Sequence, residues 1–419
     1  MFRDRPPRKK LPSVTAPPAC SCPLSLLLPA AAAPARPLVG LAGWRYRWLR
    51  QAAAIAGELP AARRPDDFWL RPDSLAAAQD GLRDVRTGVV VLTEADTGRR
   101  VLLTTQTFRF RPAAQVSAGA GGGRSGLDLR RRLLAPLSFR VLALGQLLTS
   151  GDYGQDGLRD LDAASAAALV RAVGATLARR RGYLAVLVKD LAPPGSGLAQ
   201  ALEEAGYFPL PVEPVMELAL RPHWRSVDDY LANLSSKYRV RYRRARSHLG
   251  GLRRREFTAA EVRRRAGELY ALYRRTSGRA DFNLTELTPQ YFRQLAGRAT
   301  VRAYFDGERL VGFTSEIANG GVLHAHYLGM EDRYQRSHHL YHNMLCDLLE
   351  SAIAGGFSRL DYGRTATEIK SSLGAEPVHY ATQLRARLPL LNWLVPRFVP
   401  AIFRQPEWTP RRPFRNPAT

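Results

Sequence analysis

VRAYFDGERLVGFTSEI, residues 301–317, carries the clearest structural pattern in this sequence. Two runs rich in Val, Phe and other β-formers flank Asp306 and Gly307, a pair that favours a tight turn between antiparallel strands. The stretch therefore predicts a β-hairpin.

The residues after this hairpin predict the order strand, helix, strand. GVLHAHYLGM (residues 321–330) alternates like a strand, and HLYHNMLCDLLESAIAGG (339–356) has apolar residues at helical spacing before a double-glycine stop. SRLDYG (358–363) predicts a further strand and TATEIKSSLG (365–374) a short helical turn. PVHYATQLRAR (377–387) then alternates as a final strand.

The first half of the chain repeats this order. A hairpin at residues 89–110 precedes a strand at 138–148, an Ala-rich helix at 161–182 and a buried strand at 183–191. A short helix and the strand VMELAL (215–220) close this half. We therefore predict an α/β protein of two similar units, each a mixed, mostly antiparallel sheet flanked by helices. Generic α/β proteins can produce such an order without duplication.

Length, charge and cysteine content limit the classes of function. A chain of 419 residues is long enough for two domains, and 62 Lys and Arg against 37 Asp and Glu leave a net charge of +25. This balance favours phosphate, nucleic acid or anionic membranes as partners. The three cysteines, Cys20, Cys22 and Cys346, suit neither a disulfide framework nor a metal site, so we expect no metal and a reducing cytoplasm.

Residues 1–38 form a Pro-rich, disordered extension in this interpretation. Their basic start and apolar continuation imitate a secretory signal, but Pro17, Pro18, Pro23 and Pro29 interrupt its apolar core. No apolar run is long enough to cross a bilayer.

The most basic segment, residues 225–251, lies between the two units. Ser226 and Asp229 have the spacing of a capping box, and apolar residues recur at helical intervals, so we predict one amphipathic helix. Its remaining surface is cationic: Lys237, Arg239, Arg241, Arg243, Arg244 and Arg246. Such crowding indicates either an anionic partner, bound by residues such as Arg239 and Arg241, or a solvated charged face.

The LSSKYRVRYRRA helix, the hairpin and the ending DYGRTATEIKSSLGAEP resemble the acyltransferase domain of the GNAT superfamily, in its FemAB-like and CelD/BioF2-like branches. The resemblance covers residues 224–387 and extends to the first half only in element order. It implies tandem units, an acyl-CoA donor and an amine acceptor. In the FemAB branch it implies an aminoacyl-tRNA donor and a peptidoglycan-precursor acceptor.

The donor loop of this family is altered here. GNAT proteins place glycines before the central helix so that backbone N–H groups reach the CoA pyrophosphate. The present sequence has RYQRSHH, so side chains replace glycines, and the resemblance implies cofactor contacts from five residues: Arg333, Arg336, Ser337, His338 and His339. The first unit has Gly151, Gly154 and Gly157 at this place, but Asp152 and Asp156 would repel phosphate, so this loop is interpreted as structural.

Acyl transfer to an amine requires a base, and three residues are candidates. His324 and His326 alternate onto one face of their strand and have a suitable intrinsic pKa, although such histidines are often plain polar surface. Glu316 on the preceding strand competes with them. Asp361 either orients a histidine or only ends its strand.

Lys370 and Arg364 follow the carboxyl end of a central strand, where open sheets bind ligands. We predict that Lys370 contributes to catalysis, and that both bind substrate together with Tyr362. Alternatively, Arg364 pairs with Glu368 and Lys370 caps the helical turn.

These patterns predict four segments. Residues 1–38 are the extension, 39–223 a degenerate first GNAT-like unit, 224–388 the acyltransferase domain, and 389–419 a Pro-rich apolar tail that either packs on the domain or rests on a membrane. The predicted function is N-acyl transfer from acyl-CoA (acetyl-CoA), in cell-envelope or polysaccharide biosynthesis. The alternatives are FemAB-like transfer from aminoacyl-tRNA and a non-catalytic RNA-binding protein using the Arg-rich helix.

Overall fold

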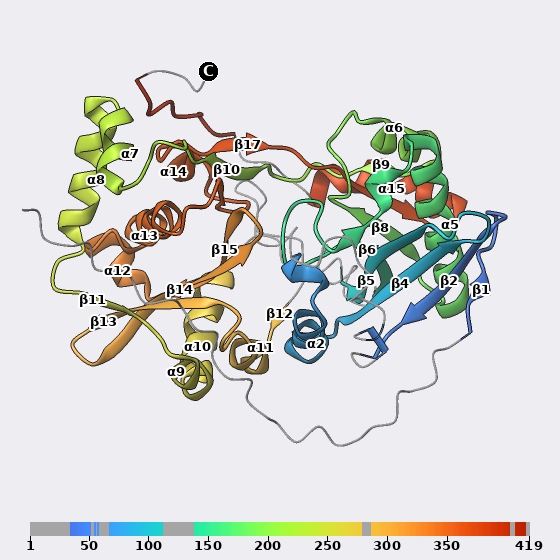
Figure 1. Ribbon diagram of the computed structural model, residues 1–419, viewed down its shortest axis with the longest axis horizontal. Coiled ribbons are helices and arrows are strands. Elements are labelled where there is room, and N and C mark those ends of the chain that lie inside the picture. The colour runs from blue at the N-terminus through green and yellow to red at the C-terminus, as the bar shows by residue number, and fades with distance from the viewer. Residues whose placement is uncertain are drawn as a thin grey trace, which may run out of the picture.

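The computed structural model describes residues 34–51, 54, 55, 57, 67–111, 138–278, 286–402 and 407–415. Nearly all of the predicted extension, with Cys20 and Cys22, lies outside these ranges. Two sheets flanked by helices stand next to each other and define two units (Figure 1). The predicted mixed α/β class is therefore confirmed.

The first sheet has nine strands, of which eight follow the spatial order β1-β2-β4-β5-β6-β8-β18-β9. Its neighbours are antiparallel except β6 and β8, which are parallel. The strands are β1 (Arg36–Pro37), β2 (Trp44–Leu49), β4 (Arg86–Glu94), β5 (Arg100–Phe110), β6 (Phe139–Leu144), β8 (Ala185–Lys189), β9 (Phe208–Pro209) and β18 (Thr382–Ala386). The short β7 (Gln155–Asp156) pairs with β5.

The helices that the structure describes in full in this first unit are α2 (Pro72–Gly81), α5 (Ala163–Arg181), α6 (Gly197–Glu204) and α15 (Pro389–Ile402), with 3-10 turns at Phe68–Leu70 and Leu158–Asp160. The side chain of Asp162 caps α5, and Gly182 ends it with φ of 66°, a backbone angle that glycine adopts without strain. The apolar face of α5 covers the sheet.

The second sheet has seven strands in the order β11-β13-β14-β15-β16-β10-β17. They are β11 (Arg253–Glu256), β13 (Thr300–Asp306), β14 (Arg309–Asn319), β15 (Val322–Met330), β16 (Arg359–Asp361), β10 (Val215–Ala219) and β17 (Glu376–Val378). Only β15 and β16 are parallel neighbours. A small ribbon of β12 (Glu286–Leu287) and β3 (Leu82–Arg83) joins the units.

The helices of the second unit are α7 (Val227–Asn233), α8 (Ser236–His248), α9 (Ala259–Arg264), α10 (Ala266–Ser277), α11 (Pro289–Gln294), α12 (Asp332–Ser337), α13 (Leu340–Ala354) and α14 (Thr367–Ser371). Residues of α13 pack with β10, β15 and β16 in a buried apolar cluster. This helix therefore fixes one face of the sheet.

The two halves of the chain exchange strands. β10, which the sequence places at the end of the first unit, lies between β16 and β17 of the second sheet. β18, which the sequence places at the end of the second unit, lies between β8 and β9 of the first. Both strand placements correct the prediction from the sequence. The predicted domain limits at residues 223 and 388 stay a prediction.

The basic segment forms two helices and not the single predicted one. Its capping box at Ser226 and Asp229 is present. Leu234, however, is extended with φ of −73° and ψ of 146°, and it forms an isolated β-bridge with Phe414. Because the far end of the chain pairs with this residue, α7 ends at Asn233 and α8 begins at Ser236.

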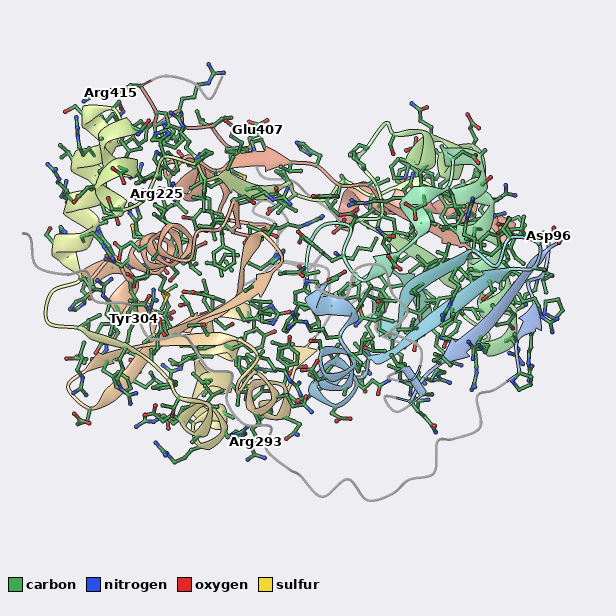
Figure 2. All side chains as sticks on the ribbon, in the orientation of Figure 1. Asp96, Arg225, Arg293, Tyr304, Glu407 and Arg415 are labelled. Carbon is green, nitrogen blue, oxygen red and sulfur yellow. The ribbon has the colours of Figure 1, made fainter. Side chains whose placement is uncertain are left out.

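A single apolar core crosses the boundary between the units. It contains Trp69 and Tyr153 from the first unit and Phe292, Phe305 and Phe313 from the second. Figure 2 shows Tyr304 inside the second unit, where its hydroxyl donates to Asp347 at 2.6 Å. A shared core of this kind holds the two sheets in one arrangement.

The apolar tail packs on the first unit in part, as one of the two predicted alternatives. It forms α15 despite Pro396 and Pro400, and Val399 enters the shared core. None of the helices built from described residues is long and apolar enough to cross a membrane.

Candidate active site

The parallel strands β15 and β16 separate in the middle of the second sheet. Their pairing runs from Val322 opposite Arg359 to His324 opposite Asp361 and stops there, although β15 continues to Met330. The chain after β16 turns away at Gly363, whose φ is 71°. The sheet therefore opens directly beyond His324 and Asp361.

A buried histidine and carboxylate pair lies at this opening. Nδ1 of His324 is 3.0 Å from Oδ2 of Asp361, and Oδ1 of Asp361 accepts from the Gly363 N–H at 2.6 Å. The His324 side chain is 97% buried. Because Nδ1 donates to the carboxylate, Nε2 carries the lone pair, and among the described residues it has no hydrogen-bond partner. An unpaired basic nitrogen in a buried site is suited to accept a substrate proton.

The first unit covers His324. The ring of Tyr153 meets the imidazole edge-on, with centroids 4.9 Å apart, and Trp69 stands at 6.4 Å. Asp67 fixes this contact, because its carboxylate accepts from the N–H groups of Trp69 at 3.0 Å and Gly154 at 3.1 Å. The histidine therefore lies at the junction of the two units.

A second carboxylate, Glu217 on the exchanged strand β10, lies opposite Asp361. Burial raises its pKa, while the guanidinium of Arg359, 2.9 Å from Oε2, opposes the shift. The hydroxyl of Tyr380 lies 3.5 Å from Oε1. The exchange of β10 thus places the polar side chain of Glu217 next to Asp361 of the histidine and carboxylate pair.

The structure separates the three predicted bases. His326 shares a face with His324, but its Nε2 lies 2.6 Å from the Tyr291 hydroxyl, and burial, aided by His324, lowers its pKa to about 3. Glu316 is opposite Ala325 and therefore points to the other face, where Ser351 of α13 donates to it at 3.2 Å. Burial raises the pKa of Glu316 to about 7, against the effect of Arg302. A catalytic role for either residue stays a prediction.

A cavity of about 540 Å³ lies between α8, α12, α14 and the beginning of α13. Its lining includes Arg241, Arg244, Gln335, His339, His342 and Ile369. A neighbouring cavity of about 440 Å³ shares Arg241 and Ile369 and adds Glu213, Thr367, Glu368 and Arg411. Two guanidinium groups and a helix N-terminus together favour an anion.

His342 has an unsatisfied nitrogen in this cavity. Burial lowers its pKa to about 4, and Arg241, His339 and Arg246 add to the effect. Its Nε2 is buried and lacks a hydrogen-bond partner in the part of the chain that the structure describes. His339, at the start of α13 with φ of 46°, stacks on His248 with ring centroids 4.2 Å apart.

Only His339 of the five predicted cofactor residues lines this cavity. Residues 332–337 form α12, which distributes the other side chains around its own axis. Arg333 bonds the Tyr334 hydroxyl at 2.8 Å, Ser337 bonds the Arg333 carbonyl at 2.8 Å, and His338 lies 2.7 Å from the Ser337 hydroxyl. Arg336 is exposed.

Two predicted substrate contacts lie on α8. Arg241 lines both cavities, whereas Arg239, two residues earlier on the helix, is absent from their linings. Sequence reasoning did not assign Arg244 or His342 to a site. Helical spacing could have found them, because each follows a cavity residue, Arg241 or His339, by three positions.

Lys370 is buried below the turn that follows β16. Its ammonium group donates to the carbonyl oxygens of Gly363 at 3.1 Å and Arg364 at 2.7 Å. Burial lowers its pKa to about 7, opposed by Asp361 and Glu213. These bonds hold the strained turn in which Thr365 and Ala366 have positive φ. Catalysis by Lys370 stays a prediction.

Arg364 joins the two units and does not pair with Glu368. Its guanidinium bonds Asp190 at 2.8 Å and Ser150 at 3.2 Å. Glu368 pairs with Arg411. Tyr362 does not line the opening, since its hydroxyl donates to the Leu345 carbonyl within the core below α13.

A metal site is not seen, since the described residues contain no group of three or more His, Cys, Asp or Glu that could hold an ion.

Comparison with protein families identifies one domain. Residues 236–371 match the family described as acetyltransferase (GNAT) domain. This range contains α8, α13, the separated strands, the His324–Asp361 pair and the larger cavity. No curated protein matches the chain.

Solved structures with a similar arrangement include three of low sequence identity. FemX is 11% identical, with 83% of this chain and 99% of that chain covered and a TM-score of 0.48. The C-terminal domain of a putative lysylphosphatidylglycerol synthetase from Agrobacterium fabrum is 9% identical, with 83% and 96% covered and a TM-score of 0.46. A tandem GNAT protein from the clavulanic acid biosynthesis pathway is 14% identical, with 82% and 99% covered and a TM-score of 0.45. Such distant likenesses carry no information on substrates.

Proposed function

We propose that this acyltransferase, whose residues 236–371 form an acetyltransferase domain of the GNAT family, transfers an acyl group from acyl-coenzyme A to an amine. The observation that carries the proposal is the His324–Asp361 pair, which presents a buried, unpartnered Nε2 where the sheet opens. GNAT domains use acyl-CoA donors. The identity of this donor and of the amine belongs to the proposal.

The reaction follows from the position of this nitrogen. The ammonium form of the acceptor first releases one proton to bulk water, and the resulting neutral amine, lying next to His324, attacks the thioester carbonyl carbon. Nε2 takes a proton from the attacking nitrogen, the new C–N bond forms and the C–S bond breaks. The proton finally reaches the departing thiolate, which leaves as CoA thiol. Asp361 orients the imidazole and stabilises its protonated form.

The phosphate end of the donor is assigned to the cavity beside α13. Arg241 and Arg244 supply charged donors, and His342 supplies a buried nitrogen without a partner. These residues suit a pyrophosphate even though the loop lacks the usual glycines. The thioester would then pass between β15 and β16 toward His324, on the opposite side of the sheet from α13.

The first unit is proposed to shape the acceptor side and not to bind a donor of its own. Asp162 occupies the N-terminus of α5, where its carboxylate accepts from the Ser165 N–H at 2.9 Å. The acidic loop at Asp152 and Asp156 is buried against the unit. Asp152 is paired with Arg159, so a second phosphate there would have to displace this carboxylate from its own ion pair. Tyr153 of this loop instead contacts His324.

The acceptor is proposed to be a small-molecule, saccharide or peptidoglycan amine used in cell-envelope or polysaccharide synthesis, in the cytoplasm. The positive charge of the chain suits a phosphorylated or lipid-linked precursor.

A second candidate is aminoacyl transfer from charged tRNA. Arg243 favours it, because this exposed residue of α8 is outside the cavity lining and extends the positive surface of Arg241 and Arg244 beyond the cavity. A non-catalytic RNA-binding protein would use the same surface but would not need the His324 site.

The test is a donor and acceptor screen with purified full-length protein. Acyl-CoA thioesters are followed by thiol release and charged tRNA by loss of the aminoacyl label, with amines and cell-wall precursors as acceptors. Thiol release that His324→Gln abolishes supports the proposal. Transfer from charged tRNA alone supports the second candidate. RNA binding without transfer from either donor would contradict both proposed enzyme activities.

A further inference from the structure

Arginines line one end of the first sheet. β2, β4, β5 and β6 alternate in direction, while β8 is parallel to β6 and β18 is antiparallel to β8. Five arginines therefore reach the same end: Arg50 after β2, Arg86 at the start of β4, Arg109 near the end of β5, Arg140 in β6 and Arg387 after β18. The register supports this placement, since Arg109 is directly opposite Arg140. The end of the sheet therefore carries one cation on each of five strands.

These charges lack carboxylate partners within the described residues. No ion pair between two described residues involves any of the five, and Asp84, close to the same end, pairs with Arg111 instead. Burial lowers the pKa of Arg50, and the positive charges of Arg181, Arg86 and Arg140 add to the effect. Like charges at this density that have no carboxylate partner among the described residues favour an anionic partner.

An exposed apolar patch adjoins the arginines. Leu388 is 50% exposed, Leu390 68% and Trp393 57%, and the described residues contain only two other large hydrophobic side chains of this exposure. The backbone fixes the patch beside the cations, because the Arg387 N–H donates to the Leu184 carbonyl and the Leu184 N–H to the Arg140 carbonyl, each at 2.8 Å.

The patch belongs to a helix that is anchored from its other side. Val399 of α15 is 96% buried in the shared core, and Asn392 donates to the Gly206 carbonyl at 3.0 Å. The guanidinium of Arg397 lies 3.6 Å from the Trp393 ring centroid. Leu390 and Trp393 thus stay at the surface while Val399 of the same helix is packed in the core. Figure 1 shows α15 beside the first sheet.

We propose that this end of the first sheet, with the adjoining part of α15, docks on a membrane surface that contains anionic phospholipids. Arginines suit the phosphate headgroups, while Leu388, Leu390 and Trp393 suit the interface between headgroups and acyl chains. A nucleic acid would satisfy the arginines but leave the two leucines in water, because aliphatic side chains provide no stacking surface for bases. The inference does not depend on the proposed acyl transfer, since none of these residues lines the candidate active site.

Vesicle co-sedimentation of the full chain tests this inference. Vesicles of phosphatidylglycerol with phosphatidylcholine are compared with phosphatidylcholine alone, at low and high salt. We expect binding only to the anionic vesicles and weaker binding at high salt. The double variant Leu390→Ser/Trp393→Ser should lower the partition coefficient at least about tenfold, and Arg140→Gln about fivefold.

Val240→Ser is the matched control for the apolar change, because Val240 is 60% exposed but lies on α8 in the other unit. It should leave binding unchanged, and all variants should keep the thermal midpoint of the unchanged chain. The inference is overturned if the unchanged chain does not co-sediment with anionic vesicles, or if the double serine variant binds them as well as the unchanged chain does. It is also overturned if Arg140→Gln weakens RNA binding while neither variant affects vesicles.

Discussion

Arg364 and Asp190 form an ion pair across the two units, with Nη2 and Oδ1 2.8 Å apart. Asp190 has no exposed side-chain surface, and it also accepts from Lys189 at 2.6 Å and Thr382 at 2.9 Å. Arg364, which follows β16 of the second sheet, is thereby bonded to Asp190, which follows β8 of the first sheet. The contact gives Arg364 a structural role beside any contact with substrate.

Removing the carboxylate should destabilise the whole protein. Asp190→Asn keeps one acceptor oxygen but leaves the cations of Lys189 and Arg364 close together without their shared negative charge, and an uncompensated buried charge costs about 3–5 kcal/mol. Chemical denaturation measures the loss. Arg253→Gln is the control, because its pair with Glu308 has side chains that are 57% and 93% exposed. A loss for Asp190→Asn no larger than that of the control would contradict the prediction.

Asp361→Asn should reduce kcat about 10²–10⁴-fold, because the imidazole loses the acceptor that sets its tautomer. His324→Gln should cost a similar factor, and the double variant little more, since the two residues act as a unit. Steady-state kinetics with the best donor and acceptor decides this. Asp96→Asn, in an exposed turn at the far end of the first unit, serves as control (Figure 2). Additive losses would show that the pair is not coupled.

Arg241→Gln and Arg244→Gln should raise the KM for acyl-CoA about tenfold or more while changing kcat little, because charged hydrogen bonds to phosphate act in binding. Arg243→Gln provides the comparison on the same helix, since Arg243 is not part of the cavity lining. The donor concentration series is repeated at high salt, which should reduce the difference in KM between the variants and the unchanged chain. If all three variants raised the KM equally, acyl-CoA would be attracted by the overall positive charge of α8 and not by a specific phosphate-binding site.

Glu316 should make stability fall as pH rises from about 4.5 to about 7. Its carboxyl pKa is raised to about 7 in the folded chain from 4.5, so the folded state holds one more proton in this window. The stability of the unchanged chain relative to Glu316→Gln should therefore decrease by about 1.4 kcal/mol per pH unit there. Denaturation of both proteins at several pH values checks the sign. A difference that stays constant with pH would contradict the shift.

The repeated order of strands and helices was predictable because each element has its own periodicity. The exchange of β10 and β18 was not, because nothing in VMELAL or ATQLRA specifies which of the two sheets the strand joins. The bend at Leu234 was missed for a similar reason, since its partner Phe414 lies 180 residues later, at the other end of the chain.

The site was predictable at the level of strands and less so for side chains. Alternation placed His324 and His326 on one face, yet the separation of Glu316 from them depends on the register with Ala325. The link from His324 to Asp361 follows from parallel pairing, which the sequence of either strand alone does not contain. Arg364 pairs with Asp190, which is 174 residues away in the sequence, and not with Glu368, which is four residues away.

The strand exchange bears on how this protein is made. On the ribosome, the first sheet is incomplete until residues 382–386 have been synthesised, because β18 separates β8 from β9. Nearly the whole chain must therefore emerge before either half can close its sheet, and the amino-terminal half would wait with an open edge. Cutting the gene between the halves would yield two fragments that each carry a strand belonging to the other.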